Sequence, residues 1–262
     1  MGLTTMIRSV KSGIWLLCGC LGFPGSAFAA PQLSLYTLEW PPFSSHDTKR
    51  GKVIGISSNI VTELFRRSGM AVPKQSLVPW ARGLAITASS KNTCLMPVAR
   101  VPEREARYRW IGPIGSSEWA LFARTEDRII LNEIDDARRY RIGTLNGDLS
   151  VSYLIAHQIQ PAVVSDDKQN IRKMQMGRID LWSTGRIAGQ ELINQLGVKN
   201  IEPVLTFMNV QLYLACSLDM GDIEVERLNS LLKAMLSDGT IKQIYRQHGF
   251  GEYAPASTSS LK

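Results

Sequence analysis

Strand-like and helix-like stretches alternate along most of this chain, and that order restricts its fold more than any other feature of the sequence. Residues 33–38 alternate apolar and polar side chains as a strand does, and an apolar stripe with helical spacing follows at 60–65. The sequence then favours a strand at 72–78, a helix at 83–90 and a buried strand at 93–98. A run of strand, helix, strand, helix and strand forms a sheet with parallel neighbours, so we expect an α/β lobe.

The alternation starts again in the second half of the chain. Apolar patterns predict strands at 119–123, 140–144, 162–164, 179–182 and 211–216, and helices at 150–157 and 170–176. Apolar residues at helical spacing between 228 and 245 predict a C-terminal helical segment. We therefore expect a first lobe at residues 30–118, a second lobe with hinge strands at 119–215, a helical segment at 216–253 that returns toward the first lobe, and a flexible tail at 254–262. A chain of 262 residues has room for a cleft between two such lobes.

The N-terminus has the features of a cleavable secretory signal peptide. Arg8 and Lys11 precede an apolar run from Gly13 to Phe23, and Ala27-Phe28-Ala29 places small residues where a signal peptidase reads them. We therefore predict a signal peptide at residues 1–29. The apolar run is shorter than the roughly 20 residues that span a bilayer, which disfavours a membrane anchor. The stretch around Cys20 loosely resembles a bacterial lipoprotein box, so lipidation of Cys20 stays an alternative.

The net charge limits the classes of ligand, and the cysteine content limits the possible disulfides. The first 29 residues hold two of the 30 Lys and Arg and none of the 23 Asp and Glu, so the mature chain carries 28 basic and 23 acidic residues, a net charge of +5. This modest excess favours small anionic ligands and does not indicate nucleic-acid binding. Cys94 and Cys216 remain after cleavage and could pair in an oxidising compartment. Because both lie in apolar runs that look like buried strands, we expect two buried thiols instead.

A series of segments, in a specific order and spacing, carries a resemblance to a known family. A strand is followed by WPPF, then GKVIGISSNIVTELFRRSG, VPEREARYRWIGPI, IGTLNGDLS, MQMGRIDLW and LSDGTIKQIYRQHG. From about Gln32 to Gly249 the chain resembles the family 3 extracellular solute-binding proteins, periplasmic receptors that hand polar amino acids and related solutes to ABC importers. The resemblance implies the two-lobed, type II periplasmic-binding-protein fold, with the cleft between lobes joined by two crossing strands. It also implies a periplasmic monomer, a small-molecule ligand and a permease partner at the inner membrane.

The resemblance further implies a carboxylate clamp and two aromatic walls for the cleft. Arg104 falls where the family places the arginine that grips the carboxylate of the ligand, and a guanidinium can do so bidentately. Trp40 matches the stacking aromatic before the PxF turn, and Trp80 has the spacing of a second aromatic. The alternatives are a surface arginine paired with a neighbouring glutamate, and indoles that belong to the core or the rim.

The chain departs from the family where an α-ammonium group would bind. Gly185 replaces the acidic residue that ends a strand of the second lobe, and Ala99 replaces the hydroxyl residue five positions before the arginine. Because a buried ammonium without partners is strongly unfavourable, we expect that the ligand is not a standard α-amino acid in the standard pose. Asp148 stands where the family often has Thr or Ser, and we expect that it caps the following helix, since its charge would otherwise repel a carboxylate.

Other charged and hydroxyl side chains are further candidates. Glu39 or Asp148, if either faces the cleft, could hold a cationic group placed differently from an α-ammonium. Arg82 and Arg186 could instead supply a second positive charge, which would suit a dicarboxylate or a phosphonate. The candidate ligand contacts are therefore Arg104, Trp40, Trp80, Glu39, Arg82, Asp148, Ser183 and Thr184.

The sequence favours a receptor over an enzyme. The three histidines are far apart, and phosphate-loop, nucleophile-elbow and dinucleotide motifs are absent, so we expect no metal, no cofactor and no catalytic constellation. An enzyme on the same scaffold, similar to cyclohexadienyl dehydratases, is one alternative. It would need a carboxyl group of raised pKa in the cleft, for which Glu39, Glu118 and Asp148 are the candidates. A ligand-sensing partner of a membrane receptor is the other alternative.

Overall fold

The computed structural model describes residues 1–3 and 33–255. The chain divides into two units, residues 1–30 and 31–262, and the fold below belongs to the second. The predicted signal peptide, apart from its first three residues, and the predicted tail from residue 256 onward lie outside the described part. Within the described residues, no helix combines the length and the apolar character that crossing a membrane requires.

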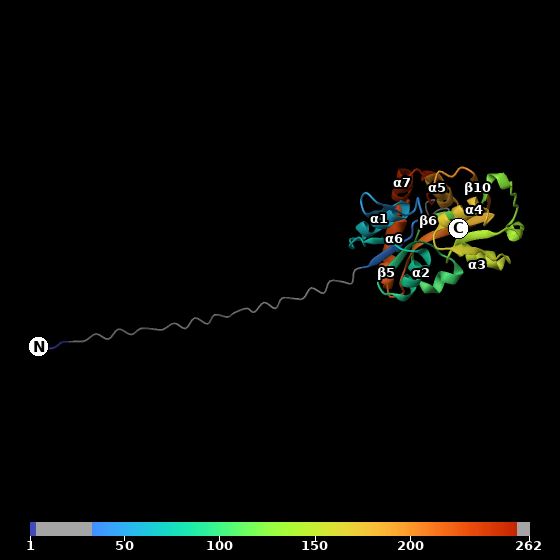
Figure 1. The fold of residues 1–262 in the computed structure, drawn as a ribbon. Coiled ribbons are helices and arrows are strands. Elements are labelled where there is room, and N and C mark those ends of the chain that lie inside the picture. The colour runs from blue at the N-terminus through green and yellow to red at the C-terminus, as the bar shows by residue number, and fades with distance from the viewer. Residues whose placement is uncertain (4–32, 256–262) are drawn as a thin grey trace. The chain divides into compact units, whose positions relative to one another are not determined.

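An eight-stranded sheet, in the order β4-β1-β5-β10-β6-β9-β7-β8, forms the centre of the fold (Figure 1). Its strands are β1 (Ser34–Thr37), β4 (Gln75–Leu77), β5 (Thr93–Ala99), β6 (Arg109–Arg124), β7 (Ile142–Leu145), β8 (Ala162–Val164), β9 (Leu181–Gly185) and β10 (Ile201–Cys216). The pairs at both ends of the sheet are parallel, whereas β10 pairs antiparallel with β5 and β6, and β6 pairs antiparallel with β9. The strand-helix alternation in the sequence therefore predicted the parallel neighbours correctly.

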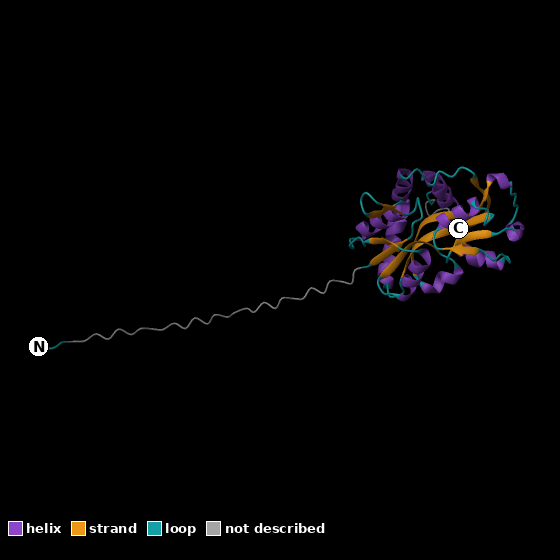
Figure 2. Ribbon diagram, in the orientation of Figure 1, coloured by secondary structure: helices purple, strands orange, loops and turns teal. Residues whose placement is uncertain are grey.

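The two long strands β6 and β10, of 16 residues each, pair along their length and join the two lobes. The first lobe holds β4, β1 and β5 with helices α1 (Ile56–Ser68), α2 (Trp80–Ser89), α6 (Asp222–Ser237) and α7 (Thr240–Gln247). The second lobe holds β9, β7 and β8 with α3 (Leu149–Ala156), α4 (Asp167–Gln175) and α5 (Arg186–Gln195). This is the two-lobed, type II periplasmic-binding-protein fold, and Figure 2 shows the strands continuing from one lobe into the other.

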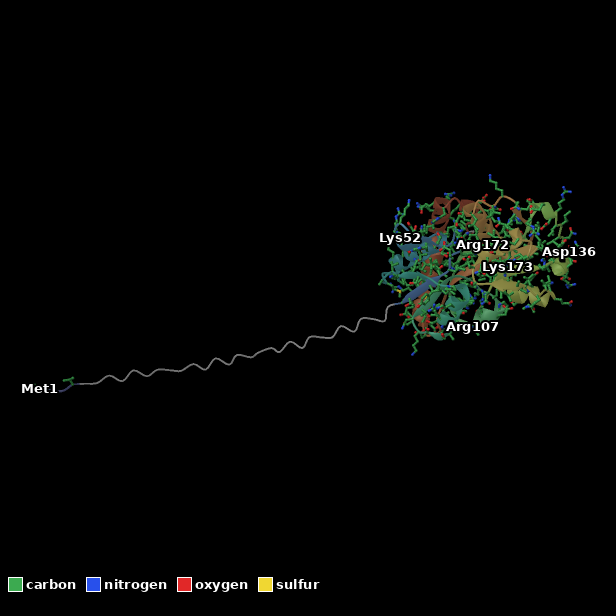
Figure 3. All side chains as sticks on the ribbon, in the orientation of Figure 1. Met1, Lys52, Arg107, Asp136, Arg172 and Lys173 are labelled. Atoms are coloured by element: carbon green, nitrogen blue, oxygen red, sulfur yellow. A yellow bond between two sulfur atoms is a disulfide. The ribbon has the colours of Figure 1, made fainter. Side chains whose placement is uncertain are left out.

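Shorter elements complete the chain. The hairpin of β2 (Ser45–Asp47) and β3 (Lys52–Ile54) lies outside the main sheet, and 3-10 turns occur at η1 (Pro102–Arg107), η2 (Thr125–Asp127), η3 (Ile134–Arg139) and η4 (Gly251–Tyr253). Basic side chains occur on many different elements. Lys52 in β3, Arg107 in η1 and Arg172 in α4 are exposed examples (Figure 3).

Buried apolar residues explain why these segments fold as they do. All seven residues of β5 are buried, because the strand lies between β1 and β10 and is covered on both faces. The sheet of the second lobe has one apolar cluster on each face, with Trp182 in one and Leu154 of α3 in the other. The cluster of the first lobe extends across the cleft to Trp119 and Leu145. The two lobes are therefore in apolar contact along the cleft.

The expectation of two free buried thiols was wrong, because Cys94 and Cys216 form a disulfide. Both side chains are fully buried, as predicted. The two residues are directly opposed in the antiparallel register of β5 and β10. That register depends on the chain returning to the first lobe, and a local reading of two cysteines separated by 122 positions does not reveal it.

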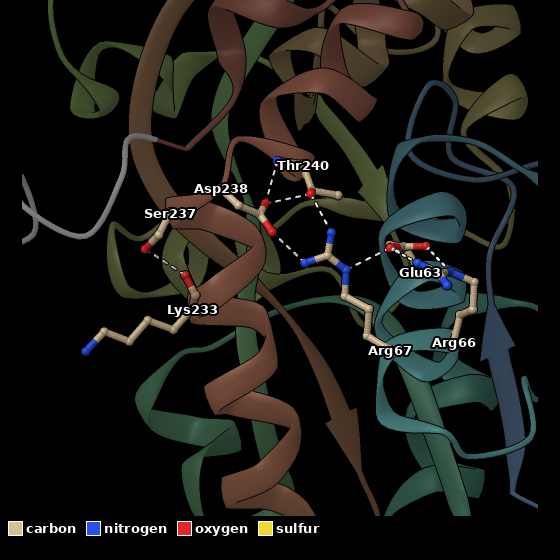
Figure 4. A network of polar contacts seen from close by, with 7 residues as sticks. All are labelled: Glu63, Arg66, Arg67, Lys233, Ser237, Asp238 and Thr240. Carbon is tan, nitrogen blue, oxygen red and sulfur yellow. Dashed lines mark hydrogen bonds and ion pairs between the residues drawn. The ribbon is translucent and has the colours of Figure 1, made fainter.

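A network of hydrogen bonds and ion pairs links helix α1 to the end of α6 and to α7 in the first lobe (Figure 4). Arg67 of α1 donates hydrogen bonds to Glu63, to Asp238 at the end of α6 and to Thr240 of α7, with distances of 2.6–2.7 Å. Glu63 also accepts two hydrogen bonds from Arg66. The hydrogen bonds from Arg66 and Arg67 lower the pKa of Glu63 to about 2, and those from Thr240 and Arg67 lower the pKa of Asp238 to about 2. Both carboxylates are thus charged in the folded protein down to low pH.

Candidate ligand-binding site

A pocket between the lobes brings together side chains from distant parts of the chain. Its free volume is about 30 Å³, room for a water molecule but not for a solute of several heavy atoms. A wider pocket of about 610 Å³, called the mouth below, adjoins it and shares Leu38, Trp80, Leu145 and Asp167 with it. A ligand with several heavy atoms therefore requires the lobes to part before it enters. The aromatic and charged residues of the inner pocket are Trp40, Trp80, Arg104, Trp119, Asp148 and Asp167.

Arg104 lies in η1, just after β5, and is only 8% exposed. Its guanidinium donates to the carbonyl oxygens of Ala99 (3.3 Å) and Gly147 (2.9 Å), and it lies 5.7 Å from the ring centre of Trp80. Burial lowers the pKa of Arg104, and the charge of Asp148 opposes that shift. A guanidinium has five N–H donors, so donors remain for a carboxylate that enters the pocket.

Aromatic side chains form much of the pocket wall. Trp80, at the start of α2, donates from Nε1 to the carbonyl oxygen of Gly147 (3.0 Å) in the second lobe. Trp40 stacks on Phe43 with ring centres 4.7 Å apart and lies 5.7 Å from the ring of Trp119. Trp40 and Trp80 thus both line the pocket, and Trp119 is a third aromatic that sequence reasoning missed.

Asp148 combines the two roles that the sequence left open. It is the N-cap of α3, because its Oδ1 accepts hydrogen bonds from the backbone N–H (2.8 Å) and the hydroxyl (2.6 Å) of Ser150. It also lines the pocket and accepts a hydrogen bond from Nε1 of Trp119 (3.0 Å). Burial raises the pKa of the Asp148 carboxyl, and its hydrogen bonds with Ser150 counteract that rise.

Asp167 is a pocket residue that sequence reasoning missed. Its Oδ1 accepts hydrogen bonds from Nε1 of Trp182 (2.9 Å) and Nδ2 of Asn170 (3.0 Å), whereas its Oδ2 has only a 3.4 Å contact with the hydroxyl of Thr184. Burial raises the pKa of Asp167 to about 7. Asp166 and Asp167 together look like helix-capping residues in the sequence, and Asp166 is indeed the N-cap of α4. No sequence signal distinguishes the aspartate that caps from the one that faces the pocket.

The remaining predicted contacts lie at different depths. Glu39 is exposed at the mouth, where it accepts a hydrogen bond from the backbone N–H of His46 (3.1 Å). Thr184 is buried behind Trp40 and contacts Asp167. Ser183 is buried in β9 and is not one of the residues that line the pocket.

The predicted second positive charge is not brought into the pocket. Arg82 is exposed on α2 and is not among the lining residues. Arg186 forms an ion pair with Glu118 (3.1 Å), in which both side chains are about half exposed. Arg104 is thus the cation that the structure places at this pocket.

Trp40 also explains the glycine at the position where the family has an acid. A Cβ atom on Gly185 would lie 2.7 Å from Cζ2 of Trp40, closer than real side chains approach. The indole therefore occupies the space that a longer side chain at this position would need. Among residues 1–3 and 33–255, no cluster of histidine, cysteine, aspartate and glutamate side chains is arranged to hold a metal ion.

Comparisons with known proteins agree with this geometry. The family described as bacterial extracellular solute-binding proteins, family 3, matches residues 35–252. The L-cystine-binding protein TcyA of Bacillus subtilis (strain 168) is 22% identical over 222 residues, which cover 81% of this chain and 78% of TcyA.

Solved structures show the same fold at low sequence identity. One describes glutathione import via GshT and the cystine ABC importer TcyBC of Streptococcus mutans; it is 20% identical, covers 86% of this chain and 98% of its own, and has a TM-score of 0.75. Another is the ancestral amino acid-binding protein AncCDT-1, a precursor of cyclohexadienyl dehydratase, with 17% identity, coverage of 82% and 94%, and a TM-score of 0.70.

Proposed function

The chain belongs to family 3 of the bacterial extracellular solute-binding proteins, and from that premise we propose that it captures a small, carboxylate-bearing polar solute in the periplasm and delivers it to an ABC importer. The solute is amino-acid-like or a modified amino acid. The protein works as a monomer with a permease partner at the inner membrane, after a signal peptide has directed its export. Similar proteins support this proposal, since one is a cystine-binding protein and one solved structure concerns glutathione import via GshT and a cystine ABC importer.

The position of Arg104 is the observation that carries the proposal. A guanidinium that is 8% exposed, with N–H donors to spare, lines a pocket whose walls include Trp40 and Trp80. A carboxylate that enters this pocket exchanges its hydration shell for charge-assisted hydrogen bonds and apolar walls. The same arrangement shields the bound solute from water when the lobes close.

A thermal-shift screen of the mature protein, residues 30–262, tests this proposal. The panel holds amino acids, their deaminated analogues, dicarboxylates and small phosphonates, because a ligand at 100 times its dissociation constant adds about 2.7 kcal/mol of stability. We expect Arg104→Ala to weaken 1:1 binding of the best ligand by about 2–5 kcal/mol, since it removes a buried charged partner. Arg82→Ala is the matched control, because it deletes the same charge from an exposed position on α2.

The results of these experiments distinguish the role of Arg104 as carboxylate clamp from the general proposal of a receptor. Full affinity in Arg104→Ala would refute the clamp, and equal losses in both variants would mean that only long-range charge matters. A receptor should release its bound solute unchanged. It should also leave prephenate and arogenate unchanged after incubation. Release of a dehydrated product would identify an enzyme instead.

A further inference from the structure

The cleft is acidic, whereas the chain as a whole is basic. The chain as a whole has a formal net charge of +7. Among the described residues of the inner pocket, however, one cation, Arg104, faces two carboxylates, Asp148 and Asp167. Two further carboxylates, Glu39 and Asp166, line the mouth. A basic protein thus has an acidic entrance to a pocket whose single guanidinium is the proposed carboxylate clamp.

The two inner carboxylates differ in their partners. Asp148 receives three hydrogen bonds on Oδ1 and, among the described residues, none on Oδ2, but the positive charge of Arg104 stabilises its charged form. Asp167 has neutral donors only, namely Trp182, Asn170 and Thr184. Once a ligand carboxylate binds Arg104, no positive charge among the inner-pocket residues remains to balance the negative charge of Asp167. A half-buried carboxylate in that situation is unfavourable unless a proton or a cation joins it.

The hydrogen bonds of Asp167 leave one oxygen available. Trp182 and Asn170 hold Oδ1 at 2.9 and 3.0 Å, which fixes the orientation of the carboxyl group. Oδ2 has only the long contact to Thr184, at 3.4 Å. The residue also lines both the inner pocket and the mouth, so a solute in either space can reach it.

We propose that Asp167 binds a cationic group of the solute, so that the ligand carries both an anionic group for Arg104 and a cationic group placed away from Gly185. The proposal rests on the proposed receptor function and names the class of solute. It also gives the chain a substitute for the acid that position 185 lacks, where Trp40 leaves no space for a side chain. Asp167 is then the residue that selects zwitterionic or cationic carboxylates over simple carboxylates.

Proton release provides a readout that a structural role for Asp167 would not produce. Since burial raises the pKa of Asp167 to about 7, some of the carboxyl groups carry a proton near neutral pH. A bound cation favours the charged carboxylate, so binding at pH 7 releases a fraction of a proton and weakens as the pH falls. The titratable and charged groups around Asp167 that must be controlled are Glu39, His46, Arg104, Asp148, Asp166 and Lys168.

A matched series of five-carbon carboxylates tests the proposal by titration calorimetry. Valerate carries no ammonium group, norvaline carries one at the α position, δ-aminovalerate carries one at the far end, and ornithine carries both. We expect at least one ammonium-bearing member to bind the wild-type protein at least tenfold more tightly than valerate, because a hydrogen bond to a charged group contributes about 1.5–3 kcal/mol. Repeating the titration in two buffers of different ionisation enthalpy measures the proton released.

Two variants with the same change of charge decide the result. Asp167→Asn keeps the oxygen that Trp182 and Asn170 bond, and we expect it to abolish both the ammonium preference and the proton release. Asp166→Asn, one residue away at the mouth, retains a capping side chain and should keep both. Proton release should also persist in His46→Gln.

Three results overturn the proposal. Valerate could bind the wild-type protein as tightly as every ammonium-bearing member, the preference could survive in Asp167→Asn, or proton release could be absent from the wild-type protein. Binding of none of the four compounds, together with no thermal shift in the wider panel, would contradict the receptor function itself, and the role of Asp167 would fall with it. A further combination would refute only the present proposal and keep the receptor function. In it, Arg104→Ala loses valerate binding, and Asp167→Asn still prefers the compounds with an ammonium group.

Discussion

The disulfide between Cys94 and Cys216 gives a quantitative prediction for the stability of this fold. It closes a loop with a sequence separation of 122 and joins β5 of the first lobe to β10, one of the two strands that connect the lobes. The loop-closure relation for that length gives roughly 16 cal/mol/K, or about 5 kcal/mol at 25 °C, and typical measured contributions are about 2–4 kcal/mol. We therefore expect the double variant Cys94→Ala with Cys216→Ala to lose about 2–5 kcal/mol of unfolding free energy.

Equilibrium unfolding in urea, followed by far-ultraviolet circular dichroism, measures this loss. The slope of the transition should also rise, because an unfolded chain without the cross-link exposes more surface. Alkylation of the wild-type protein in urea is the control, since an intact disulfide leaves no thiol to modify at Cys94 or Cys216. A loss below about 1 kcal/mol, together with two alkylated cysteines in the wild-type protein, would refute the reasoning and restore the interpretation of two buried thiols.

Two further predictions follow from particular contacts. The pKa values of Glu63 and Asp238 are lowered to about 2 in the folded protein, so their contribution to stability is complete above about pH 5 and is lost as the pH falls toward 2. Arg67→Ala should therefore reduce the unfolding free energy by about 1 kcal/mol at pH 7. The difference in unfolding free energy from the wild-type protein should vanish near pH 2. Urea unfolding at several pH values measures both. Gly185→Asp should lower stability by about 1–3 kcal/mol, because its Cβ meets the indole of Trp40, and Gly185→Ala should lose a similar amount. Unchanged melting temperatures in both variants at position 185 would contradict the placement of that indole.

The sequence predicted most elements, because apolar periodicity reports directly which faces are buried. The family and the two-lobed fold were implied by the resemblance of its ordered motifs, and both are confirmed. The sequence underestimated the two joining strands, expecting 119–123 and 211–216 where β6 and β10 each extend over 16 residues. Pro113 and Pro203 lie within those extensions, and residues of this kind look like strand breaks when only the local sequence is considered. The disulfide was missed for a related reason, since it depends on strand pairing between remote segments.

The candidate site also contains some residues that the sequence identified and others that it missed. Trp40, Trp80 and Arg104 follow recognisable motifs, and the structure places all three around one pocket. Asp167 and Trp119 carry no motif, and their position at the pocket depends on how the second lobe packs against the first. Arg82 lies near Trp80 in the sequence but turns outward on α2, because neighbouring positions on a helix point in different directions.

A crystal structure of the mature protein with the solute that gives the largest thermal shift is the most direct test of the central claim. The account predicts the solute carboxylate within hydrogen-bonding distance of the Arg104 guanidinium, about 2.7–2.9 Å between nitrogen and oxygen, with the lobes closed and the ring of Trp40 or Trp80 against the solute. A solute bound outside this pocket, or one inside it with Arg104 still held only by the carbonyl oxygens of Ala99 and Gly147, would contradict the account.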